Sequence, residues 1–281
     1  MKLAQILTKA SDYLSEKKFD NARMEAEILL SHVLNLKRVE LYANYDRPLN
    51  SQEITEYREI LKERLKGKPL QYITGECGFR YLKLRVKEGV FIPRPETEGL
   101  VELVLDYLAD KKRARVFEIG VGTGAIALSL VKENKDVEVT GVDVNPKAIA
   151  LTKENAIFNK VEQRLTLHIS DLFGLIDKKT CFNVIVANPP YISLKDQDKL
   201  EKQVVDFEPK EALFAEDNGM AVIEKIIRQA PGFLVKKGLL ALEIAESQAD
   251  KVTQIAKDSG FLKPESKKDL NGRSRYLLAR C

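Results

Sequence analysis

The chain has 281 residues, of which 44% are hydrophobic and 31% are charged, and its formal net charge at pH 7 is +4. This composition is ordinary for a globular protein, and no apolar run approaches the ~20 residues of a membrane span. Three widely spaced cysteines and two histidines without neighbouring ligand residues argue against a disulfide framework and against a metal site. The first residues show no signal-peptide core, so we expect a cytoplasmic protein of two domains, without a metal.

The first 70 residues are predicted to form a small helical domain. Apolar residues recur at helical spacing in three stretches, over 3–14, 26–34 and 54–65. Asn21 and Ser51 are the candidate N-caps. No catalytic motif lies in this part of the chain. We predict that residues 1–70 dock the substrate, with a packing role as the alternative.

The rest of the chain predicts a hairpin followed by an α/β domain. Residues 71–92 contain an alternating apolar pattern, which is typical of a β-hairpin linker. Beyond them, helices and short apolar strands alternate along 93–281. The helices are expected at 96–110, 125–132, 146–159, 220–230 and 247–259, and the strands at 115–119, 138–142, 165–170, 182–187, 239–244 and 275–280. This alternation predicts a doubly wound sheet. The charged stretch 195–202 is expected to be mobile.

The most informative motif is Asn188-Pro189-Pro190-Tyr191, directly after the apolar strand 182–187. The two prolines end the strand and stiffen the loop, because each fixes φ and lacks an N–H. Open α/β sheets bind ligands at the carboxyl ends of their strands. The Asn188 side-chain oxygen and the Pro189 carbonyl can each accept one N–H of a planar NH2 group, and Tyr191 can stack on its plane. An ordinary Asn-Pro turn is the alternative.

A glycine-rich turn, Gly120-Val121-Gly122-Thr123-Gly124, follows the strand 115–119. Glycines let a ligand approach the backbone closely. The next strand ends about 20 residues later at Asp143, the usual place for a carboxylate that binds ribose hydroxyls. The turn alone also fits a dinucleotide site, in which a pyrophosphate lies at the helix N-terminus. Glu118 would repel a pyrophosphate, whereas it suits the sulfonium and ammonium groups of S-adenosylmethionine (AdoMet).

Together, Glu118, the three glycines, Asp143 and the Asn-Pro-Pro-Tyr motif resemble the seven-stranded AdoMet-dependent methyltransferases that act on amino or amide nitrogen. From about Lys68 onward the chain resembles the HemK-type peptide-chain-release-factor glutamine N5-methyltransferases. The most specific match is Phe91-Ile92-Pro93-Arg94-Pro95-Glu96-Thr97-Glu98. Further matches are the stretch 68–75, Ser170-Asp171-Leu172-Phe173, Phe207-Glu208-Pro209, Leu242-Glu243-Ile244 and Asp269-Leu270-x-Gly272-x-x-Arg275. The chain departs from the family at Val121, where Thr is usual, and at Leu172, where an aromatic often packs near the adenine.

The resemblance implies a Rossmann-like sheet of seven strands, with the helical domain joined to it by the hairpin. It also implies methyl transfer from AdoMet to the glutamine of a Gly-Gly-Gln motif in class I release factors, by a monomer. The implied catalytic residues are Asn188, Pro189 and Tyr191, and Pro190 and Phe91 complete the substrate site. The implied cofactor residues are Gly120, Val121, Gly122, Thr123, Gly124, Asp143, Leu172 and Asn188. Pro95 and Thr97 are expected at the mouth of the cleft, and Arg94 and Glu96 are either site residues or a structural ion pair.

Two other functions are weaker hypotheses. Adenine-N6 methyltransferases of nucleic acids share the Asn-Pro-Pro-Tyr motif, but the chain has no strongly basic domain and no tryptophan. Enzymes that act on nucleic acids need many phosphate contacts, so we do not expect a nucleic-acid substrate. An NAD-binding protein or a non-catalytic module of the same fold is disfavoured by Glu118 and by the intact Asn-Pro-Pro-Tyr motif.

Overall fold

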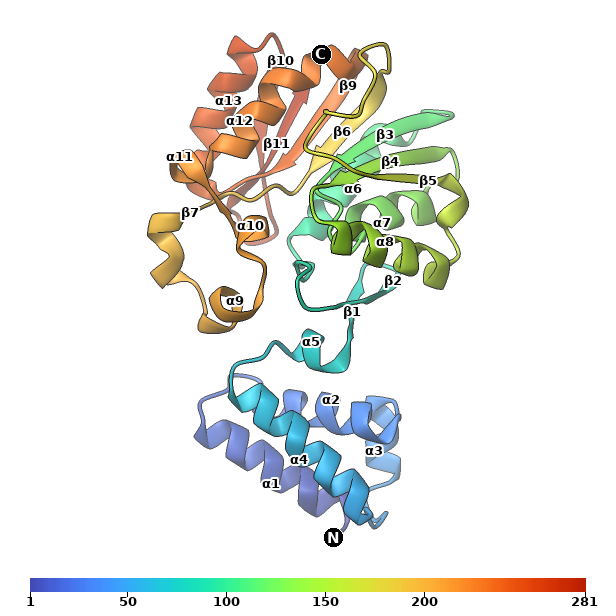
Figure 1. The fold of residues 1–281 in the computed structure, drawn as a ribbon, viewed down its shortest axis with the longest axis vertical. Helices are drawn as coiled ribbons and strands as arrows, with labels where there is room; N and C mark the ends of the chain where they lie inside the picture. The colour runs from blue at the N-terminus through green and yellow to red at the C-terminus, as the bar shows by residue number, and fades with distance from the viewer. The chain divides into compact units, whose positions relative to one another are not determined.

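A computed structural model describes all residues, 1–281, and divides the chain into two compact units (Figure 1). The helical unit consists of Met1–Glu76 together with Lys202–Phe207. The α/β unit consists of Cys77–Glu201 and Glu208–Cys281. None of the helices combines the length and the apolar character needed to cross a membrane.

The helical unit is built from short amphipathic helices around a small core that includes Leu7, Leu29 and Tyr57. Its helices are α1 (Leu3–Glu16), α2 (Ala22–Leu34), α3 (Arg38–Ala43), α4 (Ser51–Leu65) and α5 (Leu70–Thr74). The N-cap of α4 is Asn50 rather than the predicted Ser51, because the Asn50 side chain accepts the Glu53 N–H at 2.9 Å. Sequence periodicity missed α3 and α5, which are too short to show a pattern.

The helical unit also includes α9 (Lys202–Phe207), which comes from the second half of the chain. The buried Arg64 of α4 forms two hydrogen bonds with Glu25, with its Nε at 2.6 Å and its Nη2 at 3.0 Å from the carboxylate oxygens. Its Nη1 donates to Gln203 of α9 at 3.1 Å. The segment 195–202, which was expected to be mobile, contains most of a 3-10 helix (Leu194–Lys199) and the first residue of α9.

The α/β unit begins with the predicted hairpin and continues into a sheet of seven strands. The hairpin pairs β1 (Glu76–Phe79) with β2 (Leu82–Arg85). The sheet has the order β10-β11-β9-β6-β3-β4-β5. Its strands are β3 (Ala114–Ile119), β4 (Val137–Asp143), β5 (Leu165–Ile169), β6 (Phe182–Ala187), β9 (Leu234–Glu243), β10 (Leu262–Lys268) and β11 (Ser274–Arg280). β11 runs antiparallel to both of its neighbours, β10 and β9, and all other neighbouring pairs in the sheet are parallel. The predicted fold class is confirmed.

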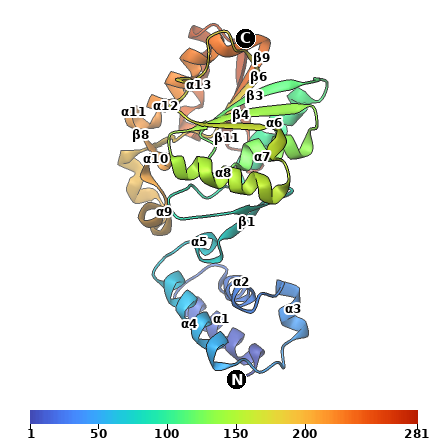
Figure 2. The ribbon, with the colours of Figure 1, turned by 45° about the vertical axis from the view of Figure 1, so that its right-hand side comes forward.

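Helices cover both faces of the sheet, as Figure 1 and Figure 2 show for α7 and α8 on one side and α12 and α13 on the other. Val116 of β3 packs on the first face and Phe117 on the second, so the strands are apolar in both directions. The first face is covered by α6 (Thr97–Leu108), α7 (Ala125–Glu133) and α8 (Pro146–Asn159). The second face is covered by α12 (Ala221–Gln229) and α13 (Ala249–Asp258). Short elements complete the unit: β7 (Ile192–Ser193), α10 (Lys210–Leu213), β8 (Phe214–Ala215), α11 (Glu216–Gly219) and 3-10 turns at Glu162–Arg164, Ala230–Phe233 and Glu246–Gln248.

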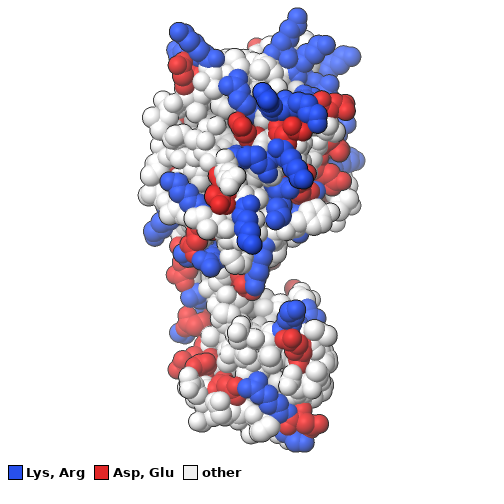
Figure 3. All heavy atoms as spheres, turned by 90° about the vertical axis from the view of Figure 1, so that its right-hand side faces the viewer, with Lys and Arg blue, Asp and Glu red and all other residues white.

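Charged side chains of both signs lie on the face of the protein drawn in Figure 3. On the face drawn in Figure 3, acidic side chains lie between the basic ones. Several basic residues are paired, as in Arg80 with Glu133 at 2.7 Å and Lys112 with Asp136 at 2.9 Å. Such pairing reduces the attraction that a net charge of +4 would exert on a phosphate backbone.

Candidate active site

The predicted motifs meet at one point of the sheet. β3 and β6 are parallel neighbours in the sheet. The strands β4 and β5 follow on one side of β3, and the next strand, β6, lies on its other side, so the strand order reverses between β3 and β6. Ligands in open α/β sheets bind at such a reversal of strand order, beyond the carboxyl ends of the strands. A cavity of about 210 Å³ lies there. Of the predicted site residues it is lined by Phe91, Thr97, Gly120, Val121, Gly122, Thr123, Asp143, Leu172, Asn188, Pro189 and Pro190.

Three residues expected at the site, Gly124, Pro95 and Tyr191, do not line this cavity. Gly124 is the N-cap of α7, with a φ of +86° that favours glycine. A Cβ there would also come within 2.9 Å of the Thr152 side chain. Gly124 therefore allows the conformation of the turn without lining the cavity. The Tyr191 ring packs against the core under α12, and its hydroxyl points to Glu243 rather than to the cavity.

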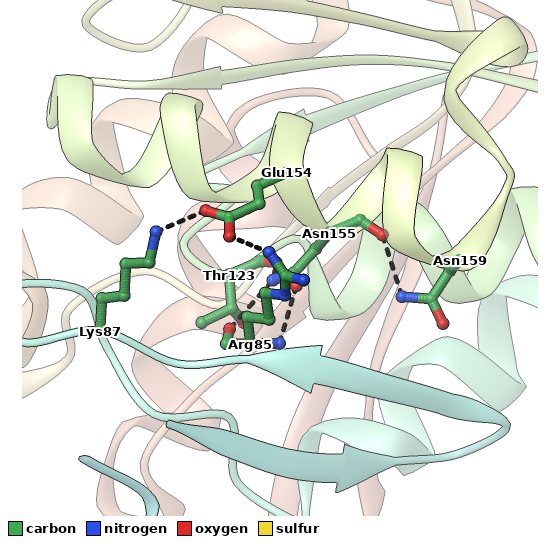
Figure 4. Close-up of polar contacts among 6 residues, drawn as sticks. All are labelled: Arg85, Lys87, Thr123, Glu154, Asn155 and Asn159. Carbon is green, nitrogen blue, oxygen red and sulfur yellow. Dashed lines mark hydrogen bonds and ion pairs between the residues drawn. The ribbon is translucent and has the colours of Figure 1, made fainter. Parts of the chain in front are cut away.

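A single buried amide, Asn155 of α8, holds both the glycine turn and the hairpin (Figure 4). Its Nδ2 donates to the carbonyls of Thr123 at 2.9 Å and Arg85 at 3.0 Å, and its Oδ1 accepts the Arg85 N–H at 2.7 Å. Outside this amide, the Glu154 carboxylate pairs with the side chains of Arg85 and Lys87. The turn is thus fixed by side chains of the helix packed beside it, so the backbone is already in place for a ligand.

Asp143 stands at the carboxyl end of β4 with its carboxylate held by two backbone amides. Its Oδ2 accepts the Gly122 N–H at 3.0 Å, and its Oδ1 accepts the Asn145 N–H at 2.8 Å. Burial raises the pKa of Asp143, and the two amides act against that shift. Leu172, on the loop after the neighbouring strand, lines the same cavity with a φ of +47°, a strained value of the kind that gathers at ligand sites.

Glu118 is the least satisfied polar group of the site. It is 1% exposed, and its Oε2 atom has no hydrogen-bond partner. Burial raises the pKa of Glu118 well above its ordinary value, the Ala127 amide lowers it, and the charge of Asp143 raises it further. An unpaired carboxylate oxygen in the wall of a cavity indicates a missing cation or donor. The site therefore fits AdoMet, which carries two cationic groups, better than it fits a pyrophosphate.

Asn188 and Pro189 present two acceptors at the cavity wall. The Asn188 Nδ2 donates to the Thr97 Oγ1 at 3.0 Å, while its Oδ1 accepts no hydrogen bond from the protein. The Pro189 carbonyl likewise accepts none. The cavity thus offers two oxygen acceptors on one rigid loop, which is what a planar NH2 group needs.

The segment before α6 is held by the buried Glu208, which belongs to a motif match in the sequence but was given no role there. Glu208 accepts the Ile92 N–H at 3.2 Å and pairs with the Arg94 guanidinium, which lies 4.7 Å from the centre of the Phe91 ring. Arg94 is therefore a structural ion-pair partner that shapes the cavity through Phe91. Glu96 contributes its backbone carbonyl, which accepts the Tyr276 hydroxyl at 2.6 Å.

Several lining residues lie outside the predicted set. They include Val90, Pro93, Val144, Asn145, Ser170, Asp171, Pro209, Glu211, Ala212 and Val222. Asn145 and Asp171 follow the ends of β4 and β5, so the rule that sites gather at carboxyl ends of strands indicates both of them. Glu211 and Ala212 carry no such signal, because they lie on the short helix α10, and Val222 lies on α12. No group of three or more His, Cys, Asp or Glu side chains is placed to hold a metal ion.

Comparison with known proteins connects this site to a family. The family model described as the PrmC N-terminal domain matches residues 5–75, and the model of the methyltransferase small domain matches residues 82–211. Among solved structures, a ribosomal protein L11 methylase from Lactobacillus delbrueckii is 20% identical with a TM-score of 0.51, covering 70% of this chain and 84% of that one. A T. thermophilus 16S rRNA methyltransferase, solved with AdoMet and guanosine, is 17% identical with a TM-score of 0.54, covering 73% of this chain and 49% of that one. These likenesses show the fold.

The curated relatives match almost end to end. The release factor glutamine methyltransferase of Leptospira interrogans is 39% identical over 97% of this chain and 96% of its own length. The release factor glutamine methyltransferase of Geobacter sulfurreducens is 38% identical over 99% of this chain and 96% of its own length. The resemblance inferred from the motifs is confirmed. The chain belongs to the family of release factor glutamine methyltransferases.

Proposed function

We propose that the protein transfers a methyl group from AdoMet to the side-chain amide nitrogen of the glutamine in the Gly-Gly-Gln motif of class I release factors. The observation that carries this proposal is the pair of unoccupied acceptors, Asn188 Oδ1 and the Pro189 carbonyl, on a rigid loop at the cavity. The relatives' names support the choice of a release factor over other proteins.

The glycine turn and the ends of β3 and β4 hold the cofactor in this proposal. Glu118 binds a cationic group of AdoMet, the turn 120–123 leaves room for the methionine part, and Asp143 accepts hydrogen bonds from the ribose. Leu172 covers the adenine. When bound, AdoMet supplies the methyl group, whose bond to sulfur breaks as its bond to the amide nitrogen forms and one N–H proton leaves to water.

The tetrapeptide acts by position and electrostatics. An amide nitrogen is a poor nucleophile because its lone pair is delocalised, and no general base belongs to the motif. Asn188 Oδ1 and the Pro189 carbonyl each accept one N–H of the glutamine, which fixes the amide plane and favours positive charge as it develops on the nitrogen. Pro190 and Phe91 line the cavity in which the glutamine side chain lies.

Glycines beside the target glutamine make physical sense. A side chain that must reach the end of a narrow cavity needs its backbone to follow closely, and glycine allows this. A tripeptide offers little binding surface, so the helical unit is proposed to bind another part of the release factor.

A methyl-transfer assay tests the proposal. Labelled AdoMet is offered with a release factor, with the same factor carrying alanine in place of its Gly-Gly-Gln glutamine, and with an adenine-containing DNA duplex. We expect label in the intact factor alone, at the glutamine found by peptide mapping. Methylation of the duplex and not of the factor would overturn the proposal in favour of an adenine-N6 methyltransferase.

Replacing Asp143 by alanine should weaken AdoMet binding by about 1–3 kcal/mol, the value of hydrogen bonds to a charged acceptor. Titration calorimetry with the ligand-free enzyme measures the change. Asp136→Ala is the matched control, because it removes an exposed carboxylate that pairs with Lys112 on the surface. An Asp143→Ala affinity equal to that of the parent would show that the ribose does not bind here.

A further inference from the structure

A chain of hydrogen bonds lies behind Asn188 and joins three elements of the α/β unit. The Asn188 Nδ2 donates to the Oγ1 of Thr97, the first residue of α6, at 3.0 Å. The Thr97 hydroxyl donates to the Oε2 of Glu243, the last residue of β9, at 2.8 Å. The other oxygen of Glu243 accepts the Tyr191 hydroxyl at 3.2 Å. A single carboxylate therefore meets both ends of the Asn-Pro-Pro-Tyr motif, once through Thr97 and once directly.

Glu243 is a buried carboxylate that the proposed mechanism does not otherwise use. It is 1% exposed. Burial raises the pKa of Glu243, while the Thr97 hydroxyl, the charge of Arg275 and the Tyr191 hydroxyl act against that shift. Arg275 is itself held by Asp269, with Nε 3.3 Å from the carboxylate. These donors and this cation give a buried charge the partners that it needs.

The direction of the hydrogen bonds fixes the orientation of the Asn188 amide. A threonine hydroxyl has one hydrogen, and Thr97 donates it to the Glu243 Oε2. The hydrogen of Thr97 is therefore committed to Glu243, and only a lone pair remains for Asn188. That lone pair can accept from the Asn188 NH2 group but would repel its oxygen. The Asn188 Oδ1 must then turn away from Thr97, as an acceptor for the substrate.

We propose that Glu243 is a positioning residue that acts through the Thr97 hydroxyl to hold the Asn188 oxygen toward the substrate amide, and through the Tyr191 hydroxyl to hold the other end of the motif. The inference rests on the proposed function, since the held oxygen is the one that accepts the glutamine N–H. The Gln248 Nε2 adds a bond to the Tyr191 carbonyl at 3.0 Å, so the end of the motif is fixed at two atoms.

Thr97→Val and Thr97→Ser separate this role from simple packing. Valine keeps the shape of the side chain but removes the hydroxyl, so the Asn188 amide is free to rotate. Serine keeps the hydroxyl. We expect Thr97→Val to lower kcat about tenfold or more, as for loss of an oriented electrostatic partner, with KM and AdoMet affinity close to those of the parent. Thr97→Ser should recover most of the parent kcat.

Tyr276→Phe is the control. It removes another hydroxyl beside the start of α6, one that does not belong to the relay, the chain of hydrogen bonds from Glu243 through Thr97 to Asn188. Its kcat should match that of the parent. Glu243→Gln leaves one neutral oxygen for two hydroxyl donors and should lower kcat in the same way as Thr97→Val. In the Asn188→Ala background, Thr97→Val should bring no further loss, because the group that it orients is absent.

The side-chain amide NMR signal of Asn188 gives a readout without substrate. It should shift in Thr97→Val and in Glu243→Gln but not in Tyr276→Phe. An unchanged signal together with parent kcat in Thr97→Val would overturn the relay, as would equal losses in Thr97→Ser and Thr97→Val. If the parent methylates no release factor, the proposed function fails, whereas the NMR comparison still decides whether Glu243 orients Asn188.

Discussion

Asn188→Ala should lower kcat for methylation of a release factor by about 10²-fold or more, the usual loss when an oriented electrostatic partner is removed. The variant keeps the fold, because the Asn188 side chain contributes one hydrogen bond, to Thr97. It removes the proposed acceptor for the substrate amide and leaves Glu118 and Asp143, the proposed cofactor-binding groups, in place. AdoMet affinity should therefore stay close to that of the parent. Steady-state kinetics with labelled AdoMet and a calorimetric titration measure the two quantities.

Asn183→Ala is the matched control for this experiment. Asn183 lies on the same strand, β6, where its Oδ1 accepts the Arg115 N–H at 2.8 Å, far along the strand from the loop. Its loss should affect stability and not kcat. Asn188→Asp is a finer test, since it keeps an acceptor oxygen but loses the NH2 group that Thr97 accepts. Near-parent turnover by Asn188→Ala would remove Asn188 from the mechanism.

The strand and the motif at the centre of the site were predictable because both are local. An apolar run followed by two prolines determines that a buried strand ends at Ala187. β10 was not predicted, because its sequence contains no such local pattern. It is an edge strand whose sequence is mostly polar, and Pro264 is its one fully buried residue. Edge strands tolerate proline and need no apolar face, so they leave little periodicity to detect.

The direction in which each motif residue points was not predictable. Tyr191 was expected to stack on the substrate, yet its hydroxyl bonds to Glu243 and its carbonyl to Gln248, which lie 52 and 57 residues later. The Thr97 that accepts the Asn188 amide lies 91 residues earlier. A motif gives the residue types on a loop, whereas partners this distant decide which side chains face the cavity. Tertiary packing supplies that information, and a single sequence does not.

Glu118→Gln should weaken AdoMet binding by about 3 kcal/mol, or two orders of magnitude in Kd, because it removes one partner of the proposed buried ion pair with the cofactor. In the ligand-free protein the same change should be stabilising. The folded-state pKa of Glu118 is raised above its ordinary value of 4.5, so the folded state binds the proton more tightly than the unfolded state does. The resulting penalty on folding is absent below the ordinary pKa, grows as the pH rises toward the raised pKa, and is fully present above it.

Binding of AdoMet should release protons from the enzyme. A cation beside Glu118 favours the ionised carboxylate, so cofactor binding lowers the raised pKa and releases a proton at any pH between the two values. The affinity for AdoMet should therefore fall as the pH falls through the raised pKa of the ligand-free enzyme. Calorimetry in buffers of different ionisation enthalpy counts the protons, and Glu118→Gln should abolish the part due to this group. Glu138→Gln, on the exposed side of β4, is the control and should leave both affinity and proton release unchanged. Equal proton release by the parent and by Glu118→Gln would mean that the unpaired Oε2 atom does not meet the cationic part of the cofactor.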